Sequence, residues 1–160
     1  MAYHDDLLDQ AIKLVHEDPA NPKQASLRRA VSAAYYAIFH LLIFEATSNY
    51  GKAHLQTALA RAFDHGTMKN ASIAVANFQA FPFEGENPAT VKALRFIGRT
   101  FINLQDQRHF ADYNLTKDLE PKDALAQVES AQTFFTPWRS IRNEDIAQAY
   151  LVSLVVKHRN

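Results

Sequence analysis

The stretch "SLRRAVSAAYYAIFHLL", residues 26–42, decides the fold class of this chain. Its apolar residues recur at intervals of three and four, which is the spacing of one helix face and not of a strand. Three alanines, Ala30, Ala33 and Ala37, form a strip where another helix can approach closely. We expect an inward face of Leu27, Val31, Ala34, Tyr35, Ile38, Leu41 and Leu42, which makes this segment the central helix.

The same spacing continues along the chain, which contains only four glycines and six prolines. Gly66 is expected to cap one helix in the left-handed conformation, and Thr67 is expected to cap the next helix. Asn87 and Pro88 are expected to begin a long helix. Pro137 is expected to separate the last two helices. The fold class predicted for residues 1–160 is all-α, a single-domain antiparallel bundle of five to six helices. Helical segments are expected over 2–17, from 23 onward, and over 52–64, 67–78, 87–114, 121–135 and 143–158.

Composition limits the classes of function. Lysine plus arginine and aspartate plus glutamate number 17 each, so the net charge is zero and any nucleic-acid binding must come from a local patch. The absence of cysteine excludes disulfides and thiolate chemistry. The start "MAYHDDLLDQ" is acidic and lacks the apolar region of a secretion signal, and residues 30–44 are expected to be too short to span a bilayer. We therefore expect a soluble cytoplasmic protein with no membrane partner.

A second informative stretch is "RHFADYN", residues 108–114, at the end of the predicted long helix. Counting back from Arg108 in helical steps gives only apolar residues: Leu104, Phe101, Ile97 and Leu94. An arginine on such a face needs a partner or a ligand, and the simplest partner is Asp112, one turn further on. With His109 and Tyr113, these residues concentrate more polar chemistry than a buried helix end usually carries.

Two further sets of residues are secondary candidates. Arg28, Arg29, Tyr36 and His40 lie on the central helix, where a plain core helix with exposed arginines is the simpler explanation. In "RAFDHGTM", residues 61–68, Arg61 and His65 are one helical turn apart and can share a phosphate or carboxylate, or simply complement a helix C-terminus.

No spacing in the sequence is typical of a metal site, a phosphate loop or a nucleophile elbow, so no metal and no cofactor is expected. The loop aromatics Phe78, Phe81 and Phe83 are expected either to form a ligand rim or, more simply, to cover the end of the bundle.

In this order and spacing, "RRAVSAAYYAIFHLL", "RAFDHGTM" and "RHFADYN" resemble the HEPN domain family, and most closely its sacsin-related branch, in which an arginine followed by Ala-Asp-Tyr is typical. The resemblance covers about residues 5–136. It implies a helical bundle that commonly dimerises and places its polar motif in a cleft at the dimer interface. Many HEPN proteins are metal-independent ribonucleases, often toxins paired with a small nucleotidyltransferase antitoxin, and others are non-catalytic binding modules.

The sequence departs from the family's nuclease motif, in which a histidine follows the arginine after four to six residues. Tyr113 stands five positions beyond Arg108, and no histidine lies in the required range. In the family's mechanism the arginine holds the scissile phosphate while the histidine assists proton transfer with the ribose 2′-hydroxyl. A tyrosine with a pKa near 10 is a poor base at neutral pH, and losing this proton transfer costs roughly 10²- to 10⁴-fold in rate.

The leading hypothesis is therefore a dimeric HEPN-type domain that binds RNA or a nucleotide through Arg108, His109, Asp112 and Tyr113, with little or no catalysis. The first alternative is a ribonuclease toxin in which His109, His40 or His65 supplies the base; its nucleotidyltransferase antitoxin is then a partner, and Tyr113 an acceptor for adenylylation. The second alternative is a protein-interaction module whose polar motif only fixes the dimer interface.

Overall fold

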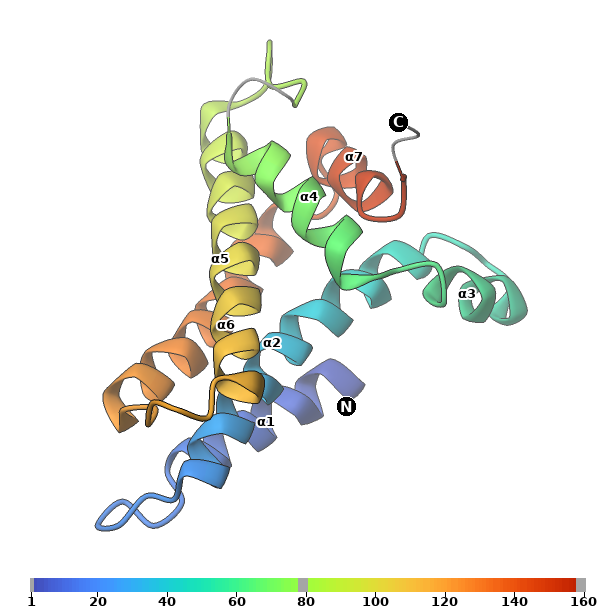
Figure 1. Ribbon diagram of the computed structural model, residues 1–160. Helices are drawn as coiled ribbons and strands as arrows, with labels where there is room; N and C mark the ends of the chain where they lie inside the picture. Colours follow the sequence, from blue (N-terminus) through green and yellow to red (C-terminus); the bar gives the residue numbers. More distant parts are fainter. Residues whose placement is uncertain (1, 78–80, 158–160) are drawn as a thin grey trace. The chain divides into compact units, whose positions relative to one another are not determined.

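The computed structural model describes residues 2–77 and 81–157, and within them every regular element is a helix (Figure 1). The predicted all-α class is confirmed. Seven helices lie in the described residues, one more than the upper end of the expected range. They are α1 (Tyr3–Val15), α2 (Gln24–Thr47), α3 (Ala53–Ala60), α4 (His65–Ala76), α5 (Pro88–Tyr113), α6 (Pro121–Ile141) and α7 (Asp145–Ser153).

The chain divides into two compact units, and each is described by itself. The first unit comprises residues 1–40 and 103–135, and the second comprises residues 41–102 and 136–160. Helices α2, α5 and α6 contribute residues to both units. The expectation of a single domain over residues 1–160 stays a prediction.

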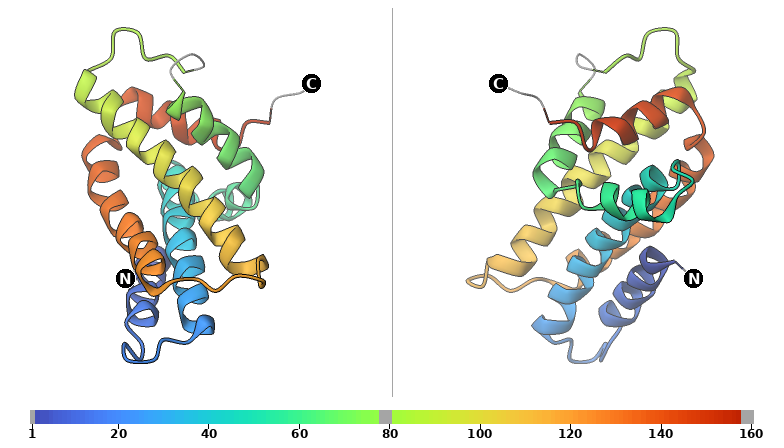
Figure 2. Two further views of the ribbon diagram at one scale, coloured as in Figure 1. Left: turned by 60° about the vertical axis from the view of Figure 1, so that its left-hand side comes forward. Right: turned by 90° about the vertical axis from the view of Figure 1, so that its right-hand side faces the viewer.

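In the first unit, α1 lies beside the N-terminal part of α2 (Figures 1 and 2). The connection between them is closed by a hydrogen bond of 2.6 Å that the Ser26 hydroxyl donates to the Glu17 carboxylate. The predicted inward face of α2 is confirmed, because each of its seven residues is at most 1% exposed. Leu27 and Val31 belong to a buried cluster that also contains Ala111 of α5, Leu119 in the connection before α6, and Ala124 of α6.

In the second unit, α4 packs closely against both α5 and α7. A Cβ atom added at Gly98 of α5 would lie 2.5 Å from Cγ2 of Val75 and 2.8 Å from the backbone oxygen of Ser72, so only glycine allows this approach. On the α7 side, the buried hydroxyls of Ser72 and Tyr150 are 2.7 Å apart and share a hydrogen bond. Trp138 of α6 packs edge-on against the Tyr150 ring.

The prediction that Pro137 separates two helices is wrong, because α6 continues through this proline to Ile141. A proline inside a helix removes one backbone hydrogen bond and crowds the preceding turn. Beyond the proline, however, Trp138 and Ile141 are buried. Burial of these large apolar side chains offsets the local cost, so tertiary packing outweighs helix propensity here.

The predicted caps near Gly66 are also wrong. Helix α3 ends at Ala60, and Gly66 lies inside α4 without a left-handed backbone. The N-cap of α4 is Asp64, whose carboxylate accepts a 2.8 Å hydrogen bond from the backbone N–H of Thr67. By contrast, the Asn87–Pro88 start of α5 is confirmed, since the Asn87 side chain accepts a hydrogen bond of 2.9 Å from the Ala89 N–H.

Helix α2 extends beyond the apolar stretch of residues 30–44 at both ends, and the expectation that this segment does not span a bilayer stays a prediction. Among the described residues, α2 alone is long and apolar enough to cross a membrane by length and composition. Its most apolar window is 67% buried within the protein, which is also what the core helix of a bundle shows.

Candidate functional site

Arg108 lies on the buried face of α5, as its position in the sequence predicts. Leu94, Ile97, Phe101 and Leu104 are fully buried, and Arg108 is 8% exposed. The stripe therefore carries a guanidinium at its C-terminal end, where burial of a charge is costly unless it is well paired.

The partners of the Arg108 guanidinium are two tyrosine rings and one carboxylate. Its central carbon lies 5.1 Å from the ring centre of Tyr35 and 5.8 Å from that of Tyr36, both on α2. Nη1 lies 3.7 Å from Oδ2 of Asp112, which is an ion pair but too long for a hydrogen bond. Nε is buried and has no hydrogen-bond partner in the described part of the chain. The predicted ion pair is thus present, but it leaves the donors of the guanidinium poorly satisfied.

Ser32 and Tyr35 are members of this cluster that the sequence analysis did not select. The Ser32 hydroxyl donates a hydrogen bond of 3.5 Å to Oδ2 of Asp112 and so joins α2 to the end of α5. We call Ser32, Tyr35, Tyr36, Arg108 and Asp112 the Arg108 cluster. A sequence signal for it exists, because Ser32, Tyr35 and Tyr36 are spaced by one helical turn on the central helix, but pairing them with α5 requires the fold.

His109 and Tyr113 lie on a different face of α5 from Arg108 and Asp112. Their rings are 4.8 Å apart, and Tyr113 is 65% exposed. Successive helix residues are about 100° apart, so one step along the helix is enough to turn this pair to solvent. The four predicted site residues thus form an ion pair between the buried Arg108 and the exposed Asp112, and an exposed aromatic pair. The exposed pair lines a shallow pocket with Asp106, Phe110, Asn114, Leu115 and Thr116.

Arg28, a secondary candidate, holds the C-terminal end of α5. Its Nη1 donates hydrogen bonds of 2.9 Å and 2.8 Å to the backbone oxygens of Ala111 and Asn114. Its Nη2 donates to the backbone oxygen of Lys117, and its Nε to the Gln24 side chain. A guanidinium with its donors engaged in this way supports the helix end and is not presented to a ligand.

The other candidates on α2 have different surroundings. Arg29 is exposed. The Tyr36 ring is stacked with the ring of His40, with 6.1 Å between centres, and Tyr3 of α1 contacts His40 edge-on at 4.9 Å. Tyr36 and His40 therefore extend the Arg108 cluster into a row of rings that reaches α1.

Arg61 and His65 do not share a helix, so the predicted one-turn spacing between them is wrong. Arg61 is the exposed C-cap residue that follows α3, and His65 is the first residue of α4. Asp64, which lies between them in the sequence, is the N-cap residue at which α4 begins. Both residues belong to the second unit.

Of the three loop aromatics, Phe78 lies outside the described residues. Phe81 and Phe83 are half-buried with ring centres 5.2 Å apart. The guanidinium carbon of Arg95 on α5 lies 5.4 Å from the Phe83 ring centre. Phe83 therefore packs on a cation of α5, an arrangement that the lid hypothesis did not anticipate.

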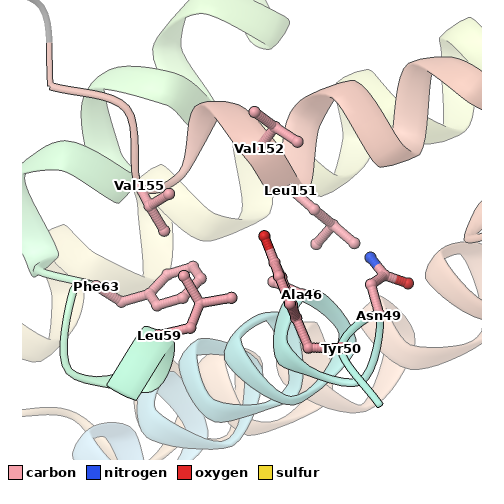
Figure 3. Close-up of a pocket in the computed structure, with 8 residues that line it drawn as sticks. All are labelled: Ala46, Asn49, Tyr50, Leu59, Phe63, Leu151, Val152 and Val155. Carbon is pink, nitrogen blue, oxygen red and sulfur yellow. The ribbon is translucent and has the colours of Figure 1, made fainter. Parts of the chain in front are cut away.

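The second unit also contains an apolar pocket of about 350 Å³. Figure 3 shows the side chains of Leu59, Phe63, Leu151 and Val155 pointing toward a common space that also receives the Tyr50 hydroxyl. This pocket could not be predicted from the sequence, because its walls come from α2, α3, α7 and the segments that follow them.

Comparison of the chain with models of protein families, with curated proteins and with solved structures finds no match. In the described residues, no group of three or more acidic or histidine side chains is placed to hold a metal ion.

Proposed function

We propose that this chain is a HEPN-type helical domain, dimeric in solution, that binds single-stranded RNA or a nucleotide at the C-terminal end of α5 with little or no catalysis. The proposal uses Arg108, His109, Asp112 and Tyr113, supported by the tyrosines of α2. It combines the sequence resemblance with the geometry of the Arg108 cluster.

One observation carries the proposal: Arg108 is only 8% exposed, and its buried Nε has no hydrogen-bond partner in the described part of the chain. Buried charges usually have short hydrogen bonds, and a loose ion pair with an unpaired Nε is costly to keep. A phosphate oxygen is a suitable acceptor for Nε and one Nη group together. We therefore assign Arg108 to a phosphate contact and Asp112 to holding the guanidinium in place when no ligand is bound.

The exposed ring of Tyr113 supplies the second half of the proposed site. Bases of single strands stack on exposed aromatic side chains, at about 1–3 kcal/mol per base. Tyr113 and His109 together present such a surface beside Phe110 and Leu115. Asp106 and Asp112 lie nearby, so the site has little net positive charge and binding depends on stacking more than on charge.

Little catalysis is expected because Tyr113 occupies the position of the family's base. Neither Tyr113→Asp nor Tyr113→Phe introduces an imidazole at this position. Tyr113→His does introduce one, and an imidazole titrates near pH 6.5. Cleavage of a labelled structured RNA in EDTA by Tyr113→His, but not by the wild type, is the expected result. Cleavage by the wild type that Arg108→Ala abolishes would instead favour the ribonuclease alternative, with the base supplied by another histidine.

Binding is tested by fluorescence anisotropy with a labelled single-stranded RNA in EDTA at several salt concentrations. Tyr113→Ala is expected to weaken binding by roughly 5- to 100-fold with the salt dependence unchanged. Arg108→Lys, which keeps the charge, is expected to weaken it less than Arg108→Ala, because lysine lacks the paired donors. Tyr50→Ala is the control, since Tyr50 is an exposed tyrosine of the second unit. Equal affinities for the wild type and Tyr113→Ala would refute the proposal.

A protein-interaction module is the second candidate, and the exposure of Leu115 favours it. This side chain is 77% exposed beside the exposed Tyr113, so two large apolar groups face solvent at one helix end. Such a patch is typical of an interface. Under this hypothesis Leu115→Ser shifts the monomer–dimer balance in sedimentation velocity, and RNA binding is absent in both forms. An unchanged sedimentation profile would count against it.

A further inference from the structure

Three cations lie along one face of the first turns of α5. Lys92, Arg95 and Arg99 are spaced by three and four residues, so their side chains leave the helix on the same side. The sign of the charge near this helix N-terminus is the reverse of the usual one. Acidic residues are favoured near a helix N-terminus, and the first turn of α5 contains none.

This arrangement brings like charges together on one face of the helix. Arg95 and Arg99 are one turn apart, and like charges at this spacing destabilise a helix. Burial lowers the pKa of Arg95 below its usual value, and the charge of Arg99 lowers that pKa further.

The three cations line a groove of about 450 Å³. Glu86 is the one carboxylate among the groove's lining residues. The ring of Phe83 lines the groove, and its centre lies 5.4 Å from the Arg95 guanidinium carbon. An excess of positive charge is thus held in a concave site on a chain whose net charge is zero.

We propose that this groove binds a phosphate group, carried by a nucleotide or by an RNA chain, through Lys92, Arg95 and Arg99. A phosphate brings up to two negative charges and several acceptor oxygens, which suits a pair of guanidinium forks with a lysine. The helix N-terminus favours the same charge. All the groove residues belong to the second unit, so this site does not depend on the proposed function of the Arg108 cluster.

The first test uses sodium pyrophosphate as the probe, titrated into ¹⁵N-labelled protein with sodium chloride adjusted to keep ionic strength constant. The Nε–H resonances of Arg95 and Arg99 and the backbone amides of residues 89–92 are expected to shift. The double variant Arg95→Gln/Arg99→Gln is expected to bind at least tenfold more weakly. Arg61→Gln removes an exposed arginine of the same unit and is expected to bind like the wild type.

Thermal unfolding without ligand checks that a loss of binding is not a loss of fold. Because Arg99→Gln removes a repulsion, its Tm is expected to equal or exceed that of the wild type while its pyrophosphate affinity falls. The Arg108 Nε–H resonance is expected to stay in place during the pyrophosphate titration, which separates this site from the one proposed on the C-terminal end of α5.

Two further probes identify the source of the phosphate. Tighter binding of ADP than of pyrophosphate supports a nucleotide, and tighter binding of an eight-residue oligouridylate supports RNA. The proposal is overturned if none of the three probes shifts the Arg95 and Arg99 resonances, or if the double variant and the wild type bind pyrophosphate equally well.

Discussion

Arg28 and Arg29 are neighbours in the sequence, but the structure gives them different surroundings. Arg28 donates to three backbone oxygens at the end of α5, whereas Arg29 is exposed. Arg28→Ala is expected to lower the free energy of unfolding by roughly 2–3 kcal/mol, because it leaves these oxygens without a charged donor. Arg28→Lys is expected to recover only part of the loss, since an ammonium group cannot reach all three oxygens.

Arg29→Ala is the matched control, and a change within about 0.5 kcal/mol is expected for this surface position. Urea unfolding of the three variants measures the difference. Equal stabilities for Arg28→Ala and Arg29→Ala would show that Arg28 does not support the end of α5.

Asp64 gives a residue-scale prediction that depends on pH. The Thr67 backbone N–H holds the pKa of this carboxyl below its usual value, and Lys157 also acts in that direction, with its Nζ 3.1 Å from Oδ2. A lowered folded-state pKa means that the stabilisation is present above the unfolded value, near 4, and is lost as the pH falls through the folded value. Asp64→Ala is therefore expected to cost about 1 kcal/mol at pH 7.

Asp64→Asn separates the cap from the charge. Asparagine also caps helices well, so this variant is expected to retain most of the stability at pH 7 but to lose the part of the pH dependence that Asp64 contributes. The measurement is urea unfolding of the wild type and both variants between pH 2.5 and 7. A constant difference between the wild type and Asp64→Asn across this range would contradict the assignment.

At the scale of the helices, replacement of glycine by alanine is expected to have opposite effects on stability at two positions. Gly98 lies where α4 and α5 touch, and its added Cβ would meet Val75 and the backbone of Ser72. Gly98→Ala is therefore expected to destabilise the protein by roughly 1–3 kcal/mol despite the better helix propensity of alanine. The nearest atom to a Cβ at Gly66, inside α4, is 3.6 Å away, so Gly66→Ala is expected to stabilise by roughly 0.5–1 kcal/mol. Thermal unfolding of both variants is the check, and shifts of the same sign would show that the α4–α5 contact is looser than described.

Much of the helical pattern could be predicted, and the exceptions have physical causes. Apolar periodicity identified the buried face of α2, and the Asn87–Pro88 pair identified the start of α5, because both signals are local. Pro137 and Gly66 misled the prediction. Each has a strong local preference, but burial of Trp138 and Ile141 decides the first case and the Asp64 cap decides the second.

At the scale of the whole molecule, the sequence could select Arg108 but not its surroundings. The apolar stripe of α5 shows that this arginine is buried, because the stripe lies within one helix. Tyr35 and Tyr36, which contact Arg108, lie about seventy residues before it in the sequence, so only the fold reveals these contacts. The role of Arg28 and the apolar pocket of the second unit also depend on residues far apart in the sequence, so they could not be predicted. The spacing of Lys92, Arg95 and Arg99, by contrast, is visible in the sequence but was not singled out.

The central claim is that the buried, unpaired Nε of Arg108 becomes a hydrogen-bond donor to an RNA or nucleotide phosphate. The most direct measurement is the Arg108 Nε–H resonance in a ¹⁵N-labelled sample, assigned by its loss in Arg108→Lys, during titration with a short single-stranded RNA in EDTA. We predict that this resonance shifts together with the backbone amide of Tyr113 as binding saturates. Saturable RNA binding that leaves both resonances unmoved, or no binding at all, would contradict the claim.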